Sequence, residues 1–275
     1  MGSIGQYSRM VCWKAVRGHS MSGPEVDAYL RSVLAAHAVP AGLLSPVGHV
    51  MVALEPVIRR WGNQFIVSIN PSGSFSKGTA VHGGTDVDIF VSLTSTLTTP
   101  LKDIYDTLFN ALSGAGYVPR RQNVSIGITV GNYKVDVTPA RRHDQTGNYH
   151  SLYSNKTGSW LQTNVSEHIR IISQSGRLEE IRLLKVWRNR LGFDFPSFYL
   201  ELFTLDALSG RRVGNLSPNI VTVLEAIRDN VASRTLIDPA NTNNIVSNTL
   251  NATEKAMLAQ AARNALASNW NQVFV

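Results

Sequence analysis

Apolar positions in the first part of the chain recur at the three-to-four-residue spacing of amphipathic helices. This pattern predicts one helix from about 24 to 37, with Ser22 as its cap and Pro24 in its first turn, and a second helix from 45 to 61. Both are expected to brace the domain that follows. Residues 1–21 lack this period and are expected to be irregular.

The middle of the chain changes to short runs of β-branched and apolar residues. These runs predict strands at 65–69, 86–93, 117–129 and 133–138, and an amphipathic stretch at 101–114 predicts a helix crossing behind them. The last two strands are expected to form a hairpin around the Gly131-Asn132 turn. From 139 to 158 the composition is that of a loop, and we place a boundary between two lobes there.

After Trp160 the pattern is helical to the end of the sequence. Helices are predicted from 163, over 178–191, over 197–208, over 218–233 with Ser217 as its cap, and over 253–269, while 237–244 is predicted to be a polar loop. The predicted fold class is therefore α+β. Its parts are N-terminal helices (1–62), a sheet domain with a mixed sheet and helices (63–140) and a helical lobe (141–275).

Composition narrows the class of protein only moderately. Charged residues make up 16% and hydrophobic residues 43%, which is ordinary for a globular protein. The net charge of +7 suits nucleotide triphosphates or nucleic acid, although the basic residues are scattered. Cys12 is the only cysteine, which excludes an intramolecular disulfide and a cysteine-rich zinc insertion. No apolar run approaches the roughly 20 residues of a membrane span, and no signal peptide is evident, so we expect a cytoplasmic protein without membrane contact.

Candidate chemistry is concentrated between residues 73 and 91. Asp86 and Asp88 are two apart at the head of a predicted strand, so both carboxylates would point to one face. Two such charges repel each other, and a divalent oxygen-binding cation such as Mg²⁺ keeps both ionised. Asp136, in a later predicted strand, offers the third carboxylate that two-metal phosphoryl transfer usually needs.

The turn that precedes these carboxylates has the residue types that contact phosphate. Gly73 and Gly78 allow close approach of the backbone, Ser74 offers a hydroxyl and Lys77 a cation. Each feature alone is common in solvated turns and strand ends, but their order along the chain favours a catalytic site. Histidines at 143 and 150 have no metal-ligand spacing and are interpreted as exposed loop residues.

These motifs resemble the signature of the polymerase-beta-like nucleotidyltransferase superfamily. Gly73-Ser74, Gly78-Thr79 and Thr85–Ile89 match its Gly-Ser…Gly-Thr…Asp-x-Asp pattern. The segments 183–188, 197–201 and 238–244 resemble the helical lobe of the oligoadenylate synthetase and cyclic GMP-AMP synthase group, particularly its bacterial anti-phage second-messenger synthases. The resemblance implies a polymerase-beta-like palm, formed by the sheet domain, followed by a C-terminal helical lobe.

The same resemblance implies a reaction and a set of contacts. NTPs such as ATP and GTP would be joined into a cyclic di- or oligonucleotide with release of pyrophosphate, and the product would activate a downstream effector protein. Asp86, Asp88 and Asp136 would hold two Mg²⁺ ions, with Mn²⁺ as a substitute. Lys185 and Ser197 would contact the triphosphate and Phe198 would stack on the base. A solvated helix lysine and a core aromatic are the competing interpretations of Lys185 and Phe198.

Two other functions stay open at this level. A template-independent RNA 3′-end nucleotidyltransferase, of the CCA-adding or poly(A) kind, uses the same palm, but the chain has no evident RNA-binding module. A catalytically silent scaffold is disfavoured by the three intact aspartates. The single cysteine and the lack of a long basic stretch argue against activation by nucleic acid.

Overall fold

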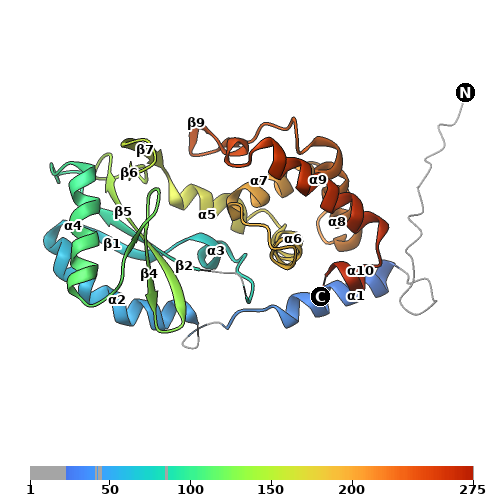
Figure 1. Ribbon diagram of the computed structural model, residues 1–275, viewed down its shortest axis with the longest axis horizontal. Helices are drawn as coiled ribbons and strands as arrows, with labels where there is room; N and C mark the ends of the chain where they lie inside the picture. Colours follow the sequence, from blue (N-terminus) through green and yellow to red (C-terminus); the bar gives the residue numbers. More distant parts are fainter. Residues whose placement is uncertain (1–22, 41, 43–44, 84–85, 275) are drawn as a thin grey trace, which may run out of the picture.

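The computed structural model describes residues 23–40, 42, 45–83 and 86–274, and these form two lobes (Figure 1). A seven-stranded sheet with helices α2 and α4 forms one lobe, and the helices from α6 onward form most of the other. The short helix α3 (Gly73–Lys77) and helix α5 (Val165–Ser173) lie between them. Among the described residues, no helix combines the length and the apolarity that crossing a bilayer requires.

The sheet has a mixed topology with β2 and β5 at its centre. Its main path runs β1-β2-β5-β4-β3, and β2 and β5 are parallel whereas the other pairs are antiparallel. A hairpin of β6 and β7 continues from the end of β5. The strands are β1 (Ile66–Pro71), β2 (Val87–Leu93), β3 (Arg120–Arg121), β4 (Ile126–Val130), β5 (Tyr133–Arg142), β6 (His150–Ser154) and β7 (Ser159–Thr163).

The alternation of side chains along β2 determines which face becomes core and which face becomes the site. Odd-numbered residues of β2, such as Val87 and Ile89, are almost completely buried against α2 (Pro46–Gly62) and α4 (Leu101–Gly114). Because successive side chains of a strand point to opposite faces, Asp88 and Phe90 lie on the face turned toward the helical lobe. The apolar core on one side therefore orients the acidic residue on the other.

The helical lobe has its own core, and the first helix of the chain belongs to it. Helix α1 contributes Val26, Leu30, Val33 and Leu34 to a cluster with residues of α6 and α8. This corrects the expectation that both N-terminal helices brace the sheet, which holds for α2 only. The helices of this lobe are α1 (Gly23–Ala36), α6 (Leu178–Arg190), α7 (Ser197–Ala207), α8 (Leu216–Asn230), α9 (Ala252–Ala267) and α10 (Trp270–Val273).

The predicted loop at 139–158 contains the end of β5 and the whole of β6. β5 continues to Arg142, and β6 and β7 pair with each other and with β5, so the sheet extends past the predicted lobe boundary. The interpretation of His143 as exposed agrees with the structure, but that of His150 was wrong, because His150 is buried in β6. These strands are rich in polar residues and offered no apolar run to recognise.

Other predicted boundaries also differ from the structure. The expected long strand at 117–129 is two short strands, β3 and β4, and the polar stretch at 237–244 forms a hairpin of β8 (Ile237–Asp238) and β9 (Asn241–Ile245). Helix α8 begins at Leu216 after Asn215, so Ser217 lies inside the helix rather than at its cap. The proposed cap Ser22 and the segment 1–21 lie outside the described residues. Short 3₁₀ turns lie at Asn63–Phe65 and Val246–Thr249.

Candidate active site

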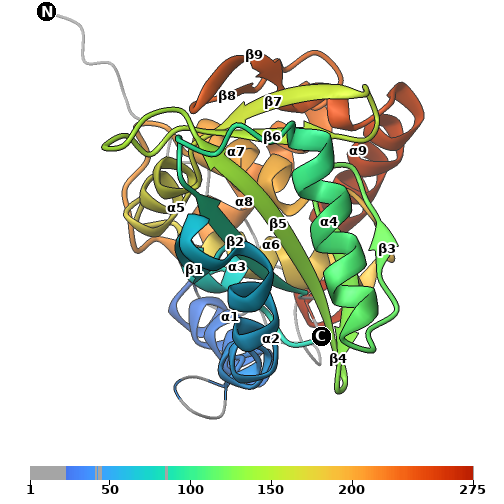
Figure 2. The same cartoon turned by 90° about the vertical axis from the view of Figure 1, so that its left-hand side faces the viewer.

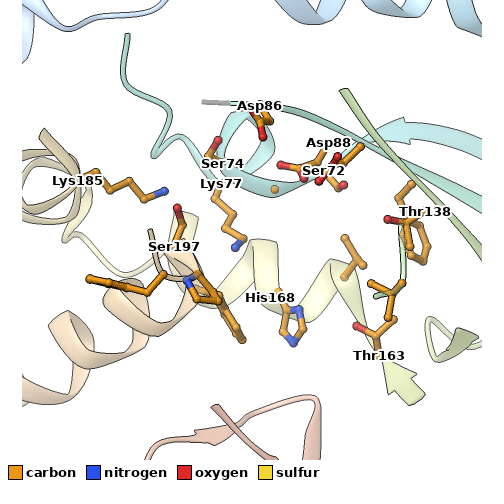
Figure 3. A pocket seen from close by; sticks show the side chains of 18 of the residues that line it. Ser72, Ser74, Lys77, Asp86, Asp88, Thr138, Thr163, His168, Lys185 and Ser197 are labelled. Carbon is orange, nitrogen blue, oxygen red and sulfur yellow. The ribbon is translucent and has the colours of Figure 1, made fainter. Parts of the chain in front are cut away.

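Three carboxylates line the floor of a cavity between the two lobes. Asp88 in β2 and Asp136 in β5 are direct neighbours in the register of the parallel pair, and Asp86 immediately precedes β2. The cavity has a volume of about 710 Å³. Figure 3 shows Asp86 and Asp88 on one side of it, with His168 and Ser197 on the other.

Except for Gly78, the residues that the sequence analysis proposed as catalytic, metal or phosphate contacts line this one cavity. Besides the carboxylates, they come from the segment around α3 and from α6 and α7 of the helical lobe. They are Gly73, Ser74, Lys77, Asp86, Asp88, Asp136, Lys185, Ser197 and Phe198. Residues more than 100 positions apart in the sequence are thus brought to a common surface, while their individual roles remain predictions.

Asp88 and Asp136 are held in an environment that disfavours their ionisation. Burial and the neighbouring Asp136 raise the pKa of Asp88 to about 6, although Lys77 opposes the shift. Burial and Asp86 also raise the pKa of Asp136, whose Oδ1 accepts a hydrogen bond of 2.9 Å from Nε2 of Gln122. Negative charge is therefore concentrated here without full compensation, which is the condition that a bound cation relieves.

The donor chemistry of the three carboxylates fits a hard cation such as Mg²⁺. Among the residues that the structure describes, however, no group of three or more His, Cys, Asp or Glu side chains is arranged to hold a metal ion. The three carboxylates nevertheless line one cavity. Bound phosphate oxygens and water would have to supply the remaining ligands.

Gly73 allows the backbone to lie directly against Asp88. Its φ is +57°, and a Cβ added there would lie 1.7 Å from Oδ2 of Asp88. The amide of Ser72 donates to the carbonyl of Asp88 at 2.8 Å, which fixes the turn to the strand. Gly78, with a φ of +73°, ends α3 in the left-handed conformation. The Gly-Ser turn is therefore positioned beside the carboxylates, as its sequence order suggests.

A buried ionic network connects the two lobes at the edge of the cavity. Glu201 of α7 accepts from Lys77 at 2.8 Å and from Lys185 at 2.7 Å, and the hydroxyl of Thr79 donates to it at 2.7 Å. Nζ of Lys185 also donates to the hydroxyl of Thr79 at 2.8 Å. Lys185 is 2% exposed, so it is not a solvated helix lysine, and its ammonium group is occupied by protein partners.

This network contains two cations, Lys77 and Lys185, and one anion, Glu201. Burial by itself would raise the pKa of Glu201, but Lys77 and Lys185 outweigh it and lower that pKa to about 2. Burial lowers the pKa of Lys185, although Glu201 opposes this shift. Glu201 is ionised, because it faces two cations, whereas Lys185 faces one anion.

Ser197 and Phe198 begin helix α7 and form the opposite wall. The hydroxyl of Ser197 accepts from Arg188 at 3.0 Å. The ring of Phe198 lies 4.5 Å from that of His168 between centroids, and Nζ of Lys77 lies 4.7 Å from its centroid. Phe198 also packs against the helical core, so it serves both the core and the cavity.

Sequence reasoning assigned no role to Glu201, His168 or Gln122. Glu201 had a recognisable signal, since it is an acidic residue within an otherwise apolar turn of α7 and thus required a buried partner. Nε2 of His168 donates a 2.7 Å hydrogen bond to Oδ1 of Asp238, 70 residues away. Gln122, which follows β3, reaches Asp136 in β5 across the intervening strand β4. Those two pairings depend on tertiary contacts that no local pattern encodes.

Comparisons with known proteins place this geometry in context. No family model matches the sequence. The cyclic AMP-AMP-AMP synthase of Escherichia coli (strain MS 115-1) is 24% identical over 159 residues, covering 53% of this chain and 50% of that protein. The match therefore spans about half the length of this relative.

Solved structures of similar proteins cover much more of the chain. CdnC of E. coli MS115-1, solved with ATP, gives a TM-score of 0.65 at 20% identity over 82% of this chain and 88% of that one. CdnG of Bradyrhizobium diazoefficiens, a CD-NTase solved with GTP, gives 0.73 at 15% identity over 90% and 92%. The chain has a nucleotidyltransferase fold. These matches confirm the predicted α+β class and the predicted resemblance to bacterial cyclic-oligonucleotide synthases.

Proposed function

We propose that this protein is a metal-dependent nucleotidyltransferase that joins NTPs into a cyclic di- or oligonucleotide and releases pyrophosphate. The observation that carries the proposal is the juxtaposition of Asp86, Asp88 and Asp136 on the floor of one interlobe cavity. The relatives support it, because one is named as a cyclic AMP-AMP-AMP synthase and two were solved with ATP or GTP.

The proposed division of labour follows from where the side chains lie. Asp86, Asp88 and Asp136 would hold two Mg²⁺ ions, which neutralise phosphate charge and lower the pKa of an attacking hydroxyl. Ser74 and the glycine at 73 border the carboxylates, so they are suited to contact the triphosphate. Asp136, whose carboxylate accepts a hydrogen bond from the neutral side chain of Gln122, would lie near the acceptor hydroxyl and favour its deprotonation.

Two cations at the cavity edge have a supporting role in this scheme. Lys77 and Lys185 are both held by Glu201, so the triphosphate meets an already ordered pair of ammonium groups rather than flexible ones. Preorganised charge of this kind stabilises a transition state without reorganisation during the reaction. Phe198 and His168 offer aromatic faces on which a base can stack.

The activity test is incubation of the purified protein with all four NTPs and Mg²⁺ or Mn²⁺, followed by phosphatase treatment and mass spectrometry. We expect a phosphatase-resistant cyclic product that is absent from the Asp86→Asn/Asp88→Asn variant. Extension of an added RNA 3′ end without a cyclic product would instead identify the RNA-tailing activity. Failure of both reactions, with full biological activity of the double variant, would identify a scaffold.

We further infer a signalling role in the cytoplasm, in which the product activates a separate effector protein in anti-phage defence. The inference rests on the resemblance to bacterial second-messenger synthases. It is tested by phage challenge of cells that carry the gene with its neighbours, in wild-type and Asp86→Asn/Asp88→Asn form. Equal plaque counts with the two forms would refute the defence role while leaving the synthase activity intact.

A further inference from the structure

A second cavity lies on the same face of the sheet, beyond the catalytic one. It has a volume of about 340 Å³ and is bordered by β1, β2, the ends of β5 and β6, and helix α5, which lies beside β1 and β2 in Figure 2. Phe90 and Val165 line both cavities and separate them. Asp88 therefore faces the first cavity, and Ser92, four residues further along β2, faces the second.

A chain of hydrogen bonds fixes the inner wall of this cavity. Nε of Arg142 donates to the hydroxyl of Ser92 at 3.2 Å, and that hydroxyl lies 2.8 Å from Nε2 of His150. Nδ1 of His150 faces the carbonyl of Asn148 at 2.9 Å, so Nδ1 carries the proton and Nε2 accepts from Ser92. Ser92 and His150 are buried, and burial lowers the pKa of His150. The imidazole is therefore neutral, and Arg142 is the charged residue of this hydrogen-bonded series.

The charge of Arg142 has no carboxylate partner in the described part of the chain. Its guanidinium donates to the hydroxyl of Ser92 and, from Nη1 at 3.2 Å, to the carbonyl of Gln145. Among the described residues, no Asp or Glu lines the cavity. Glu167, in the first turn of α5, is engaged by Arg170 through two hydrogen bonds and is not a lining residue. A half-buried guanidinium that meets only neutral oxygens retains the capacity to bind an anion.

The other lining groups match an anion with an organic portion. Ser68, Asn70 and Ser166 supply neutral hydrogen-bonding groups, and Ser166 is in the first turn of α5, where backbone amides favour negative charge. Phe90, Val165 and Ile169 supply an apolar wall. The volume is at the lower end of the roughly 300–1,000 Å³ of small-molecule sites, which suits a ligand of mononucleotide size or smaller.

We propose that this second cavity binds the phosphate group of a small molecule, with Arg142 as its principal charged contact. The planar guanidinium presents paired N–H donors that match two phosphate oxygens. The ligand is either inorganic phosphate or a mononucleotide, which share this group. The site does not depend on the three carboxylates and therefore stands or falls independently of the proposed synthase activity.

The experiment titrates the protein with sodium phosphate and, separately, with AMP, in EDTA at constant ionic strength. The readout is the ¹H–¹⁵N imidazole signal of His150, which lines this cavity and does not line the catalytic one. We expect a saturable shift in the wild type and in Arg228→Gln, a control whose arginine is paired with Asp229 on the surface. Binding should weaken by about tenfold or more in Arg142→Gln, the loss expected for one charge-assisted hydrogen bond.

A second variant keeps the test decisive if Arg142→Gln folds poorly. Ser166→Asp places a carboxylate at the rim of the cavity on an exposed position, where a helix first turn tolerates acidic residues well. It should weaken binding of both probes while preserving the fold. Equal affinity for the two probes would assign the site to phosphate alone, and tighter binding of AMP would assign it to a nucleotide. No saturable shift with either probe, or unchanged binding in Ser166→Asp, would overturn the proposal.

Discussion

Replacement of Glu201 by glutamine is expected to destabilise the protein strongly, because Glu201 compensates two buried cations at once. Glu201 and Thr79 are 0% exposed, Lys185 is 2% exposed and Lys77 is 8% exposed. Glutamine keeps the shape of the side chain but removes its charge, so both ammonium groups lose their counter-ion inside the protein.

The expected loss of stability follows from the cost of leaving one partner of a buried ion pair without the other. Removing one partner of such a pair typically costs about 3–5 kcal/mol, because a desolvated charge is left uncompensated. Two factors act in opposite directions here: two cations are affected rather than one, and Lys185 can lose its proton, since burial already lowers its pKa. We therefore expect a loss of about 3–5 kcal/mol in the free energy of unfolding, without doubling.

The assay is urea denaturation followed by tryptophan fluorescence, which the buried Trp187 of α6 makes sensitive to the helical lobe. Glu179→Gln is the matched control, because Glu179 forms an exposed ion pair with Arg31 at 3.4 Å. Exposed pairs contribute about 0–1 kcal/mol, so this control should change stability little. A loss below about 1 kcal/mol in Glu201→Gln would refute the view that this network is a buried, fully desolvated one.

Other substitutions test the carboxylate cluster. Because the pKa of Asp88 is raised to about 6 in the metal-free fold, its protonated form adds stability that is complete below pH 3.8 and lost as pH rises through about 6. Asp88→Asn should therefore raise the free energy of unfolding of the metal-free protein above pH 6 by up to about 3 kcal/mol, while abolishing nucleotide transfer. Equal urea midpoints for the two proteins at pH 7.5 would contradict this. Gly73→Ala should reduce activity far more than Gly78→Ala, because both are strained at positive φ but only the first would displace Asp88, and kcat measured on both folded variants decides the point. Gln122→Ala should raise the pKa of Asp136 further, because it removes the hydrogen bond that favours the ionised form; a carboxyl ¹³C titration of the metal-free protein that gave an unchanged or lower value would count against this role.

Local patterns were sufficient for the elements whose sequence is governed by one periodicity. The helices observed at 46–62 and 101–114 lie within one residue of the predicted limits, because each has one apolar stripe against the sheet. The Asp-x-Asp pair was recognisable from its spacing at the head of a predicted strand. The strand itself begins one residue later than predicted, so Asp86 precedes β2 and only Asp88 lies in it.

The sequence did not show which segments pack against each other in the folded chain. The apolar stripe of α1 predicts a buried helix but does not distinguish a sheet from a helical bundle as its partner, and the bundle is what it packs against. The β6–β7 hairpin was missed because its strands mix polar residues with isolated aromatic and leucine side chains, so no apolar run marks them. Pairing of β6 with β5, and of β7 with β6, defines them instead. Lys185 was predicted to contact substrate from the helical lobe, whereas only the folded chain reveals that Thr79 and Glu201 hold it.

The position of α1 in the helical core has a consequence for the order in which the chain can fold during synthesis. Helix α1 leaves the ribosome before the whole sheet lobe, yet its buried residues pack on α6 and α8, which are made roughly 150 to 190 positions later. The hydroxyl of Tyr29 likewise bonds to the carbonyl of Phe274, next to the last residue. The sheet lobe can thus assemble from one continuous stretch as it emerges, whereas the helical lobe must wait for its final helices and keeps an apolar helix exposed in the meantime. Such delayed closure between distant segments is slow and favours association with chaperones, so a nascent chain of this protein should be most vulnerable to aggregation until α6 and α8 have emerged to cover α1.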